Sequence, residues 1–410
     1  KREAHIETKE IFSTALGLPP PWQVTKLEFS VEGKRLDITI DFPRGSNFSC
    51  PECGLEGCKA YDTQEEEWRH MNFFQFAAYL HARVPRVRCG KGCGVKKVEV
   101  PWSRPGSGFT LLFEALILAL AREMPVAAIA ALLGEHDTRL WRVIHHHVDQ
   151  ARKETDLSRV SHVGIDETAS RRGHRYISLF YDLLEKRLVF GTEGKDGGTV
   201  KRFREDLGQN RGDPKKVQRV CCNMSPAFIS GVERHLPNAE ITFDRFHIMK
   251  IMQTAVDNVR REEVYENDLL KKPRYIWLKT PCNLKEKQKE TFCALSRLNV
   301  KTARAYRIRL ALQEFFLQPN RKAGEAFLKR WYFWATHSRL DPVIEAAKTI
   351  KNHWNRILNW FEARITMGLL EGVNSLIQAA KARARGYRTS KNMITIAYLI
   401  AGKLDFNLPT

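Results

Sequence analysis

The chain has 410 residues, of which 43% are hydrophobic and 28% are charged, and Lys plus Arg outnumber Asp plus Glu by 67 to 47, for a net charge of +20. This length predicts two to four domains with packed cores, and the absence of any run of eighteen apolar residues argues against a membrane-spanning helix. The charge favours a polyanionic partner, usually nucleic acid, over the alternative of a generally basic surface with no specific partner.

The first residues, KREAHIETKE, are charged throughout, so we expect no signal peptide. A start without Met suggests a trimmed or engineered N-terminus. The nine Cys are an odd number, and four of them form two close pairs. This pattern suits metal binding in a reducing compartment better than a disulfide framework, so we expect a cytoplasmic protein.

Residues 1–104 are predicted to form an N-terminal β region. The segment VTKLEFSVEGKRLDITIDF alternates apolar and polar side chains around a turn at Glu32, Gly33 and Lys34, which is typical of a β-hairpin. Strand-like runs such as QFAAYLHARVPRVRC follow. The Pro-, Gly- and Ser-rich stretch PWSRPGSG at 101–108 then indicates a domain boundary.

The cysteines of this region predict a zinc ribbon. Cys50-x-x-Cys53 and Cys89-x-x-x-Cys93 each stand beside glycines, which allow the tight turns that aim two thiolates at one ion. Four thiolates in tetrahedral geometry suit a structural Zn²⁺. Cys58 is a weaker candidate ligand because its distance from Cys53 fits such a turn less well. Buried free thiols or a disulfide are the alternatives.

Residues 105–155 are predicted to form three helices: FTLLFEALILALARE, PVAAIAALLG and the stretch from His136 to Ala151. Pro125 suits the first turn of the second helix, and Gly134 suits its end. A helix, a glycine turn and a second helix are typical of a helix-turn-helix, in which the second helix enters the major groove of DNA. An ordinary pair of antiparallel helices is the alternative.

In the third helix, we expect Arg139 and Arg142, with His136 and Thr138 as further candidates, to face double-stranded DNA. Leu140, Val143 and Ile144 are expected to pack inward. Consecutive residues point in different directions on a helix, so His145, His146 and His147 cannot chelate one ion. We expect these three to form a solvated or phosphate-facing surface.

Residues 156–250 show the element order of an RNase H-like α/β domain. HVGIDE reads as a short strand ending in an acid, and HRYISLFYDL and KRLVFGTEG as two strands joined through Leu184, Glu185 and Lys186. A helix over 199–207, the strand KVQRVCCN, the helix SPAFISGVERHLP and the strand AEITFDRFH follow.

Three blocks of this sequence, GIDE, NMSPAFISGVERHLPNAEITFDRFHIMK and LLEGVNSLIQAAKARARGYRTSKN, resemble the core of bacterial insertion-sequence transposases of the ISL-three family. In that family GIDE carries the first catalytic Asp, DMSPAF the second and EGVN the Glu. The resemblance implies a DDE-type transposase with two catalytic Mg²⁺ or Mn²⁺ ions, and assigns catalytic and magnesium-binding roles to Asp166, Asn223 and Glu371.

Asn223 departs from the family pattern, which has Asp at this position. Two metal ions about 4 Å apart need carboxylates to hold them, and a neutral amide oxygen binds Mg²⁺ poorly. We therefore expect catalysis to be impaired, either because Asn223 was introduced to trap an inactive complex or because this copy is naturally inactive. The start without Met favours the first explanation.

Asp244, in DRFH, is a rival for the second acid. It ends the fifth strand, whereas the fourth strand borders the first in an RNase H-like fold, so position 223 is the better neighbour for Asp166. Asp244 and His247 are expected to support catalysis near the metals or the DNA. Glu167 is expected to point away from Asp166, because neighbouring residues of a strand face opposite sides.

Between these blocks, residues 251–365 are basic and helical in pattern and are predicted to form an α-helical insertion domain. Its tryptophans are expected to form the core, with stacking of one of them on a flipped base as the alternative; they are Trp277, Trp331, Trp334, Trp354 and Trp360. Residues 366–410 complete the RNase H-like core. DNA contacts near the scissile phosphate are expected from Lys381, Arg383, Arg385 and Arg388.

Together these features predict a multidomain α+β protein: a zinc ribbon, a helix-turn-helix and an RNase H-like domain with an α-helical insertion. The resemblance implies cut-and-paste transposition, in which water attacks the phosphodiester at the element end and the freed 3′-hydroxyl attacks target DNA. We expect a homodimer in the synaptic complex and a location at the bacterial nucleoid. A DNA-binding regulator and a metal-dependent nuclease are the alternatives.

Overall fold

The computed structural model describes residues 8–171, 173, 175–265, 270–271, 274–297, 300–363 and 368–409, without the side chains of 296, 297, 363 and 368–371. The chain divides into two compact units, Lys1–Asp149 with Asp405–Thr410 and Gln150–Leu404. These units are coarser than the five predicted segments, whose boundaries stay predictions. Over the described residues, no helix combines the length and apolar character needed to cross a bilayer.

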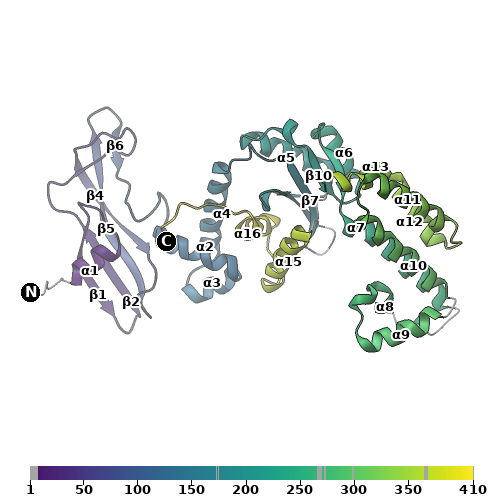
Figure 1. Cartoon of the computed structure of the whole chain (residues 1–410). Coiled ribbons are helices and arrows are strands. Elements are labelled where there is room, and N and C mark those ends of the chain that lie inside the picture. Colours follow the sequence, from purple (N-terminus) through teal and green to yellow (C-terminus); the bar gives the residue numbers. More distant parts are fainter. Residues whose placement is uncertain are drawn as a thin grey trace, which may run out of the picture. The chain divides into compact units, whose positions relative to one another are not determined.

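The first unit contains a six-stranded sheet (Figure 1). Its elements are α1 (Thr8–Ala15), β1 (Gln23–Ser30), β2 (Arg35–Asp41), β3 (Asn47–Phe48), β4 (Cys58–Arg69), β5 (Ala77–Cys89) and β6 (Gly94–Lys97). The strand order is β1-β2-β5-β4-β3, and β6 pairs with β5. The predicted antiparallel hairpin of β1 and β2 is confirmed. Because β2 also pairs in parallel with β5, the hairpin and the cysteine-bearing strands share one sheet.

The stretch 101–108 is part of the packed structure of this unit. The Trp102 ring is buried and meets Trp22 edge-on, with ring centroids 5.0 Å apart. The Ser103 hydroxyl is buried and donates to the Phe109 carbonyl at 2.8 Å. A composition rich in Pro, Gly and Ser therefore does not mark an exposed spacer here.

The three helices predicted after this stretch are confirmed as α2 (Leu111–Glu123), α3 (Val126–Leu133) and α4 (Asp137–Glu154). The Thr110 side chain caps α2 by accepting from the backbone N–H of Phe113. Gly134 ends α3 with φ 68, a left-handed conformation that favours glycine. These local signals explain why the sequence places the helix ends well.

The second unit contains a five-stranded sheet with the order β11-β10-β7-β8-β9. Its strands are β7 (His162–Arg171), β8 (Arg175–Asp182), β9 (Arg187–Glu193), β10 (Arg219–Cys222) and β11 (Glu240–Phe243). β10 pairs in parallel with both β7 and β11, whereas β8 is antiparallel to β7 and β9. The expectation that the fourth strand borders the first is confirmed. The expectation that the first strand, HVGIDE, ends at Glu167 is wrong, because pairing with β8 extends β7 to Arg171.

Helices cover both faces of this sheet (Figure 1). They are α5 (Gly197–Gln209), α6 (Pro226–His235), α15 (Gly368–Arg383) and α16 (Ser390–Ala401). The Phe180 ring of β8 stacks on the Phe203 ring of α5, with ring centroids 4.6 Å apart. The neighbouring Tyr181 donates a hydrogen bond to Asn374 of α15. Adjacent residues of a strand face opposite sides. Hence α5 and α15 lie on opposite faces of the sheet.

The remaining helices of the second unit lie between β11 and α15 in the chain. They are α7 (Arg245–Val264), α8 (Arg274–Leu278), α9 (Glu286–Arg297), α10 (Lys301–Gln313), α11 (Arg321–Thr336), α12 (Asp341–Asn352), α13 (Trp354–Leu358) and α14 (Trp360–Ala363). Trp277 and Trp331 are fully buried in a hydrophobic core that continues into the sheet, and Trp354 and Trp360 pack against it. Trp334 is 43% exposed, so the expectation that all five tryptophans are core residues is wrong for this one.

Candidate active site and metal centre

The four predicted zinc ligands lie together at one end of the first sheet. The Sγ atoms of Cys50, Cys53, Cys89 and Cys93 all lie within 4.8 Å of one another. Cys58 is buried outside this group, and its thiol donates to the Leu55 carbonyl at 3.4 Å. Such a set of four close thiols fits the tetrahedral coordination of Zn²⁺.

The electrostatics of this cysteine cluster also suit a cation. A backbone hydrogen bond from Lys91 lowers the pKa of the Cys89 thiol to about 6, so one thiolate forms readily. Hydrogen bonding with Cys53 and Cys89 raises the pKa of Cys93 to about 12. Four thiolates at this spacing repel one another, and only a positive ion between them allows all four to ionise together.

A second group of metal-ligating side chains, Asp37, Glu67 and His81, lies on the same sheet. Here the Arg35 guanidinium already pairs with both carboxylates at 2.7 Å. His81 completes the network by its hydrogen bond to Asp37 at 2.6 Å. This group is satisfied as a charge network and fits a metal ion poorly.

The helix-turn-helix residues divide into buried and exposed sets as predicted. Leu140, Val143 and Ile144 of α4 are buried, and Arg139 and Arg142 are exposed. Arg139 donates to Glu135 at 2.6 Å, and its guanidinium carbon lies 4.2 Å from the centroid of the Phe109 ring. Its side chain is therefore held in place before any DNA arrives, while its role in reading DNA stays a prediction.

His147 departs from the expectation of a solvated surface. Its imidazole is buried and lies 2.6 Å from the carboxylate of Glu114, which is itself fully buried. Burial alone would raise the pKa of Glu114, but hydrogen bonds from His147, Ser107 and Arg104 hold it below its ordinary value. Because α4 turns His147 towards α2, this residue links two helices and does not face solvent.

Two predicted site positions, Asp166 and Asn223, and the rival Asp244 lie where β10 and β11 end beside β7. In the observed register Cys221 of β10 pairs with Gly164 of β7, and Cys222 pairs with Phe243 of β11. Two residues further along β7 is Asp166, and the next residues after β10 and β11 are Asn223 and Asp244. Positions 166, 223 and 244 are therefore level across neighbouring strands, about 5 Å apart per strand, with 223 in the middle.

The surroundings of Asp166 disfavour its ionised form. Burial raises the pKa of Asp166 to about 6, and the negative charges of Glu167 and Asp244 act in the same direction. Asp244 is 5% exposed. A buried carboxyl group with further carboxylates nearby is the donor set that a hard divalent cation prefers. The site residues present thus fit a divalent metal, with Asn223 as the neutral member.

Asn223 and His247 have separate local roles. The Asn223 Oδ1 atom accepts from the backbone N–H of Ser225 at 2.9 Å and so closes the turn before α6. His247 lies one turn into α7, where burial and the charge of Lys250 lower its pKa. An Asp at position 223 could accept the same backbone hydrogen bond, because it has the same oxygen in the same place.

Asn374, in the last position of EGVN, is a site residue that sequence reasoning missed. Its Nδ2 donates to Asp166 Oδ2, and its Oδ1 accepts from the Tyr181 hydroxyl at 2.9 Å. Burial raises the pKa of the Tyr181 phenol, so this group remains a donor. The spacing of Asn374 three residues after Glu371, which places both on one helix face, was the available signal.

Glu371 itself belongs to α15, but its side chain lies outside the described residues. The same helix continues along β7, where Gln378 donates to the Thr168 hydroxyl and Lys381 Nζ to the Ala169 carbonyl. Arg383 lies in the last turn of α15, and Arg385 and Arg388 lie in the turn that leads to α16. The predicted basic residues thus lie in the last turn of this helix and in the turn that follows it.

Comparison with known protein families gives matches to three successive segments of the chain. Residues 163–397 match a model of DDE transposases of the ISL3 family. Residues 98–148 match the helix-turn-helix domain of that transposase family, and residues 46–93 match the zinc finger of the IS204, IS1001, IS1096 and IS1165 transposases. The helix-turn-helix and the zinc ribbon predicted from the sequence are therefore confirmed as domains.

Curated relatives agree with these matches. The chain is 26% identical to the transposase for insertion sequence element IS1557 of Mycobacterium tuberculosis, covering 95% of this chain and 94% of the relative. It is 25% identical to the transposase for insertion sequence element IS1001 of Bordetella parapertussis, over 90% and 93% of the two chains. The similarity thus runs through all the predicted domains.

Proposed function

Since the chain belongs to the ISL3 family of transposases, we propose that it binds the ends of an insertion sequence, cleaves the DNA there and joins it to a target by strand transfer. The observation that carries this proposal is the alignment of positions 166, 223 and 244 at one sheet edge, with Asn374 of EGVN bonded to Asp166. A buried acidic edge reached by α15 is a suitable place for metal-dependent phosphodiester chemistry.

The second unit is, on this proposal, an RNase H-like domain with an α-helical insertion. In support, three antiparallel strands in sequence, β7, β8 and β9, are followed by two parallel strands on the other side of β7. The helices between β11 and α15 interrupt this order, and their core continues that of the sheet. The proposed segments are 156–250 and 366–410 for the domain and 251–365 for the insertion, and α7 is continuous across residue 250.

Two divalent ions, Mg²⁺ or Mn²⁺, are proposed to be held by Asp166, position 223 and Glu371. When bound, such ions activate the attacking oxygen and stabilise the leaving oxygen of the phosphodiester. Glu371 precedes Asn374 by three residues on α15, and residues at this spacing share a helix face. Since Asn374 bonds to Asp166, helical spacing supports Glu371 as the third carboxylate of the same site.

Asn223 is proposed to impair catalysis in this chain. It lies between Asp166 and Asp244 in register and contributes a neutral oxygen where the family has a carboxylate. Asp244 is close enough for its charge to raise the pKa of Asp166. We assign it, with His247, a supporting role at the edge of the site, since its strand is one place further from β7.

DNA recognition is proposed for Arg139 and Arg142 of α4, with a structural Zn²⁺ at the cysteine cluster. DNA contacts at the end of α15 are also proposed for Lys381, Arg383, Arg385 and Arg388. The net charge of +20 should make binding strongly dependent on salt, because phosphate contacts release counterions. A homodimer is proposed for the complex with two element ends, at the bacterial nucleoid.

The test of catalysis is the Asn223→Asp variant, with DNA that carries the ends of the encoding element as substrate. The original chain should bind these ends and cleave them very slowly. The variant should raise the single-turnover cleavage rate with Mg²⁺ by roughly a hundredfold or more, because the restored charge contributes several kcal/mol to metal-assisted catalysis. In the restored chain, Asp166→Ala and Glu371→Ala should abolish cleavage with little change in end binding.

The same experiment separates the alternatives. Cleavage without joining to target DNA would identify a nuclease, and end binding without any cleavage after Asn223→Asp would favour a regulator that retains only recognition. Asp244→Ala should reduce cleavage less than Asp166→Ala. Equal losses, combined with tolerance of any residue at 223, would give the role of second acid to Asp244.

The test of DNA reading compares Arg142→Gln with Arg122→Gln, which removes an exposed charge from α2. Arg142→Gln should lower the preference for element ends over random duplex by roughly tenfold, as for a lost base contact, whereas Arg122→Gln should leave that ratio unchanged. An equal loss on both DNAs would show that α4 does not read sequence.

A further inference from the structure

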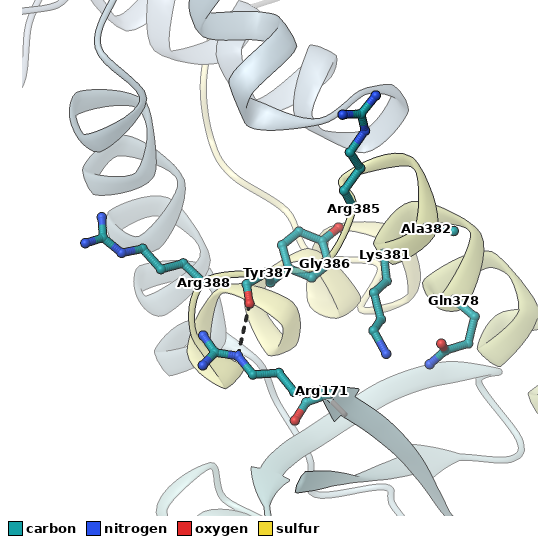
Figure 2. Close-up of a pocket in the computed structure, with 9 residues that line it drawn as sticks. Arg171, Gln378, Lys381, Ala382, Arg385, Gly386, Tyr387 and Arg388 are labelled. Carbon is teal, nitrogen blue, oxygen red and sulfur yellow. Dashed lines mark hydrogen bonds between the residues drawn. The ribbon is translucent and has the colours of Figure 1, made fainter. Parts of the chain in front are cut away.

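A strongly basic pocket lies where the end of β7 meets the turn between α15 and α16 (Figure 2). Its volume is about 760 Å³, within the range of typical ligand sites. The lining contains no carboxylate and four cationic side chains: Arg171 of β7, Lys381 of α15, and Arg385 and Arg388 of the turn. Such a lining favours an anion.

The cations of the pocket keep most of their hydrogen-bonding capacity. Arg171 Nε donates to the Tyr387 carbonyl at 3.4 Å, and Lys381 Nζ donates to the Ala169 carbonyl at 2.6 Å. Both partners are neutral, and a guanidinium has five N–H donors and an ammonium three. Over the described part of the chain, none of the four cations has a carboxylate within ion-pair distance, whereas Arg152, in the same unit, pairs with Asp206 at 2.7 Å.

The turn that forms the pocket depends on its backbone. Gly386 has φ 97, and its N–H donates to the Lys381 carbonyl at 2.8 Å, which ends α15 and reverses the chain. Figure 2 shows Lys381 and Gln378 directed towards β7, while Arg385 and Arg388 extend from the turn. Arg171 and Lys381 therefore form the floor of the pocket, and Arg385 and Arg388 its rim.

The pocket also lies at a fixed distance from the proposed catalytic carboxylate. Asp166, Thr168 and Ser170 are alternate residues of β7, and Ser170 lines the pocket. Four residues of a strand span about 13 Å at roughly 3.3 Å each. In DNA, phosphates of one strand advance about 3.4 Å along the helix axis per nucleotide, and because the strand also winds around the axis they are farther apart through space. A distance of about 13 Å therefore corresponds to two or three nucleotides.

We propose that this pocket binds a backbone phosphate of the DNA strand that is cut, two or three nucleotides from the scissile bond. The pocket thereby sets the position of the scissile phosphate over Asp166. This proposal rests on the proposed function, and it adds Arg171 to the DNA-binding residues while leaving Arg383, which does not line the pocket, outside the phosphate site.

The test measures binding of the full chain to element-end duplexes in which one phosphate at a time, one to eight nucleotides from the cut, is a neutral methylphosphonate. In the original chain, neutralising the phosphate two or three nucleotides away should weaken binding by roughly tenfold, as for one lost hydrogen bond to a charged group. In the rim variant Arg385→Gln/Arg388→Gln that position should lose its sensitivity, because the contact is already missing.

The matched control is Arg383→Gln/Lys391→Gln, which removes two nearby charges outside the pocket lining. It should weaken binding to all duplexes alike, while the same methylphosphonate position should still weaken binding further.

The pocket proposal is overturned if the rim variant keeps the full sensitivity to that methylphosphonate, if the control abolishes it too, or if dTMP binds the pocket tightly while the methylphosphonate profile is flat. A chain that shows no preference for element ends contradicts the proposed function and not this site in particular.

Discussion

The cysteine cluster and the carboxylate edge are built in opposite ways. The Sγ atoms of Cys53, between β3 and β4, and Cys89, at the end of β5, lie 3.4 Å apart, and the two residues are only 36 positions apart in the chain. Asp166 meets Asn374 across a separation of 208 residues, and positions 223 and 244 arrive from two further strands. A structural metal site can thus be encoded by local spacing, whereas the proposed catalytic site exists only once the whole second unit has folded.

The largest expected effect concerns the local side of this comparison. Purified protein should contain about one zinc per chain, and Cys53→Ser should lose it together with the folded structure of β3, β4 and β6, because structural zinc contributes roughly 10 kcal/mol or more to small zinc domains. Metal analysis and hydrogen exchange of these strands measure both effects. Cys58→Ser, which changes a buried thiol outside the cluster, should keep the zinc. A folded, zinc-free preparation of the original chain would contradict the site.

The next effect concerns the acid sensitivity of the same unit. His70 lies 2.8 Å from the Thr110 hydroxyl that caps α2, and burial lowers its pKa from 6.5 to about 4. The folded state therefore binds fewer protons than the unfolded state between these values. The contribution of the neutral His70 side chain to the free energy of unfolding is complete above pH 6.5. It is lost as pH falls towards 4, by up to about 3 kcal/mol.

Hydrogen exchange of β5 amides, corrected for the intrinsic rate, should show this loss between pH 7 and pH 5. His70→Gln should flatten the pH dependence, whereas His136→Gln, at an exposed histidine of the same unit, should not change it. If the β5 amides of the original chain are equally protected at both pH values, His70 does not link this unit to pH.

The sequence predicts much of the first unit because its signals are local. Gly134 ends a helix, the cysteine pairs mark their turns, and the hairpin of β1 and β2 follows from alternation and a turn. His147 was misjudged because its burial depends on Glu114, which is 33 residues away. Trp334 was misjudged because helical periodicity alone does not say which face of α11 is covered.

At the carboxylate edge, the sequence predicts strand order and hence the neighbours of Asp166, but not its hydrogen bonds. Asn374 was hidden because a strand and a helix far apart in the chain meet there. The extension of β7 beyond Glu167 was missed because TASR lacks the large apolar residues that mark HVGI, although β8 pairs with this extension through Arg171. Basic residues were predicted at the end of α15, but the pocket they form with Arg171 requires the fold.

A third effect tests whether this long-range assembly matters for activity. In the chain restored by Asn223→Asp, Asn374→Ala should slow single-turnover cleavage by roughly 10- to 100-fold, the cost of a hydrogen bond to a charged group. The Mn²⁺ concentration needed for half-maximal rate should rise, because Asp166 loses its fixed orientation, while end binding should stay the same. Asn238→Ala, which removes an amide hydrogen bond to the Lys215 carbonyl, is the matched control. An unchanged rate and Mn²⁺ curve for Asn374→Ala would make this contact merely structural.

The smallest effect concerns Tyr181, which fixes the orientation of the Asn374 amide. The phenol donates to Asn374 Oδ1, so the amide nitrogen must face Asp166 and cannot exchange places with the oxygen, which would repel the carboxylate. Tyr181→Phe removes this control but leaves the packing and the amide in place. In the restored chain it should slow cleavage by roughly 2- to 10-fold, the cost of one neutral hydrogen bond, and should change nothing further when combined with Asn374→Ala.

Tyr306→Phe, which removes a buried hydroxyl bonded to the Lys279 carbonyl, loses a similar hydrogen bond away from the site and should leave the rate unchanged. If Tyr181→Phe and Asn374→Ala instead add their effects, the two residues act separately, and Tyr181 does not position Asp166 through the amide.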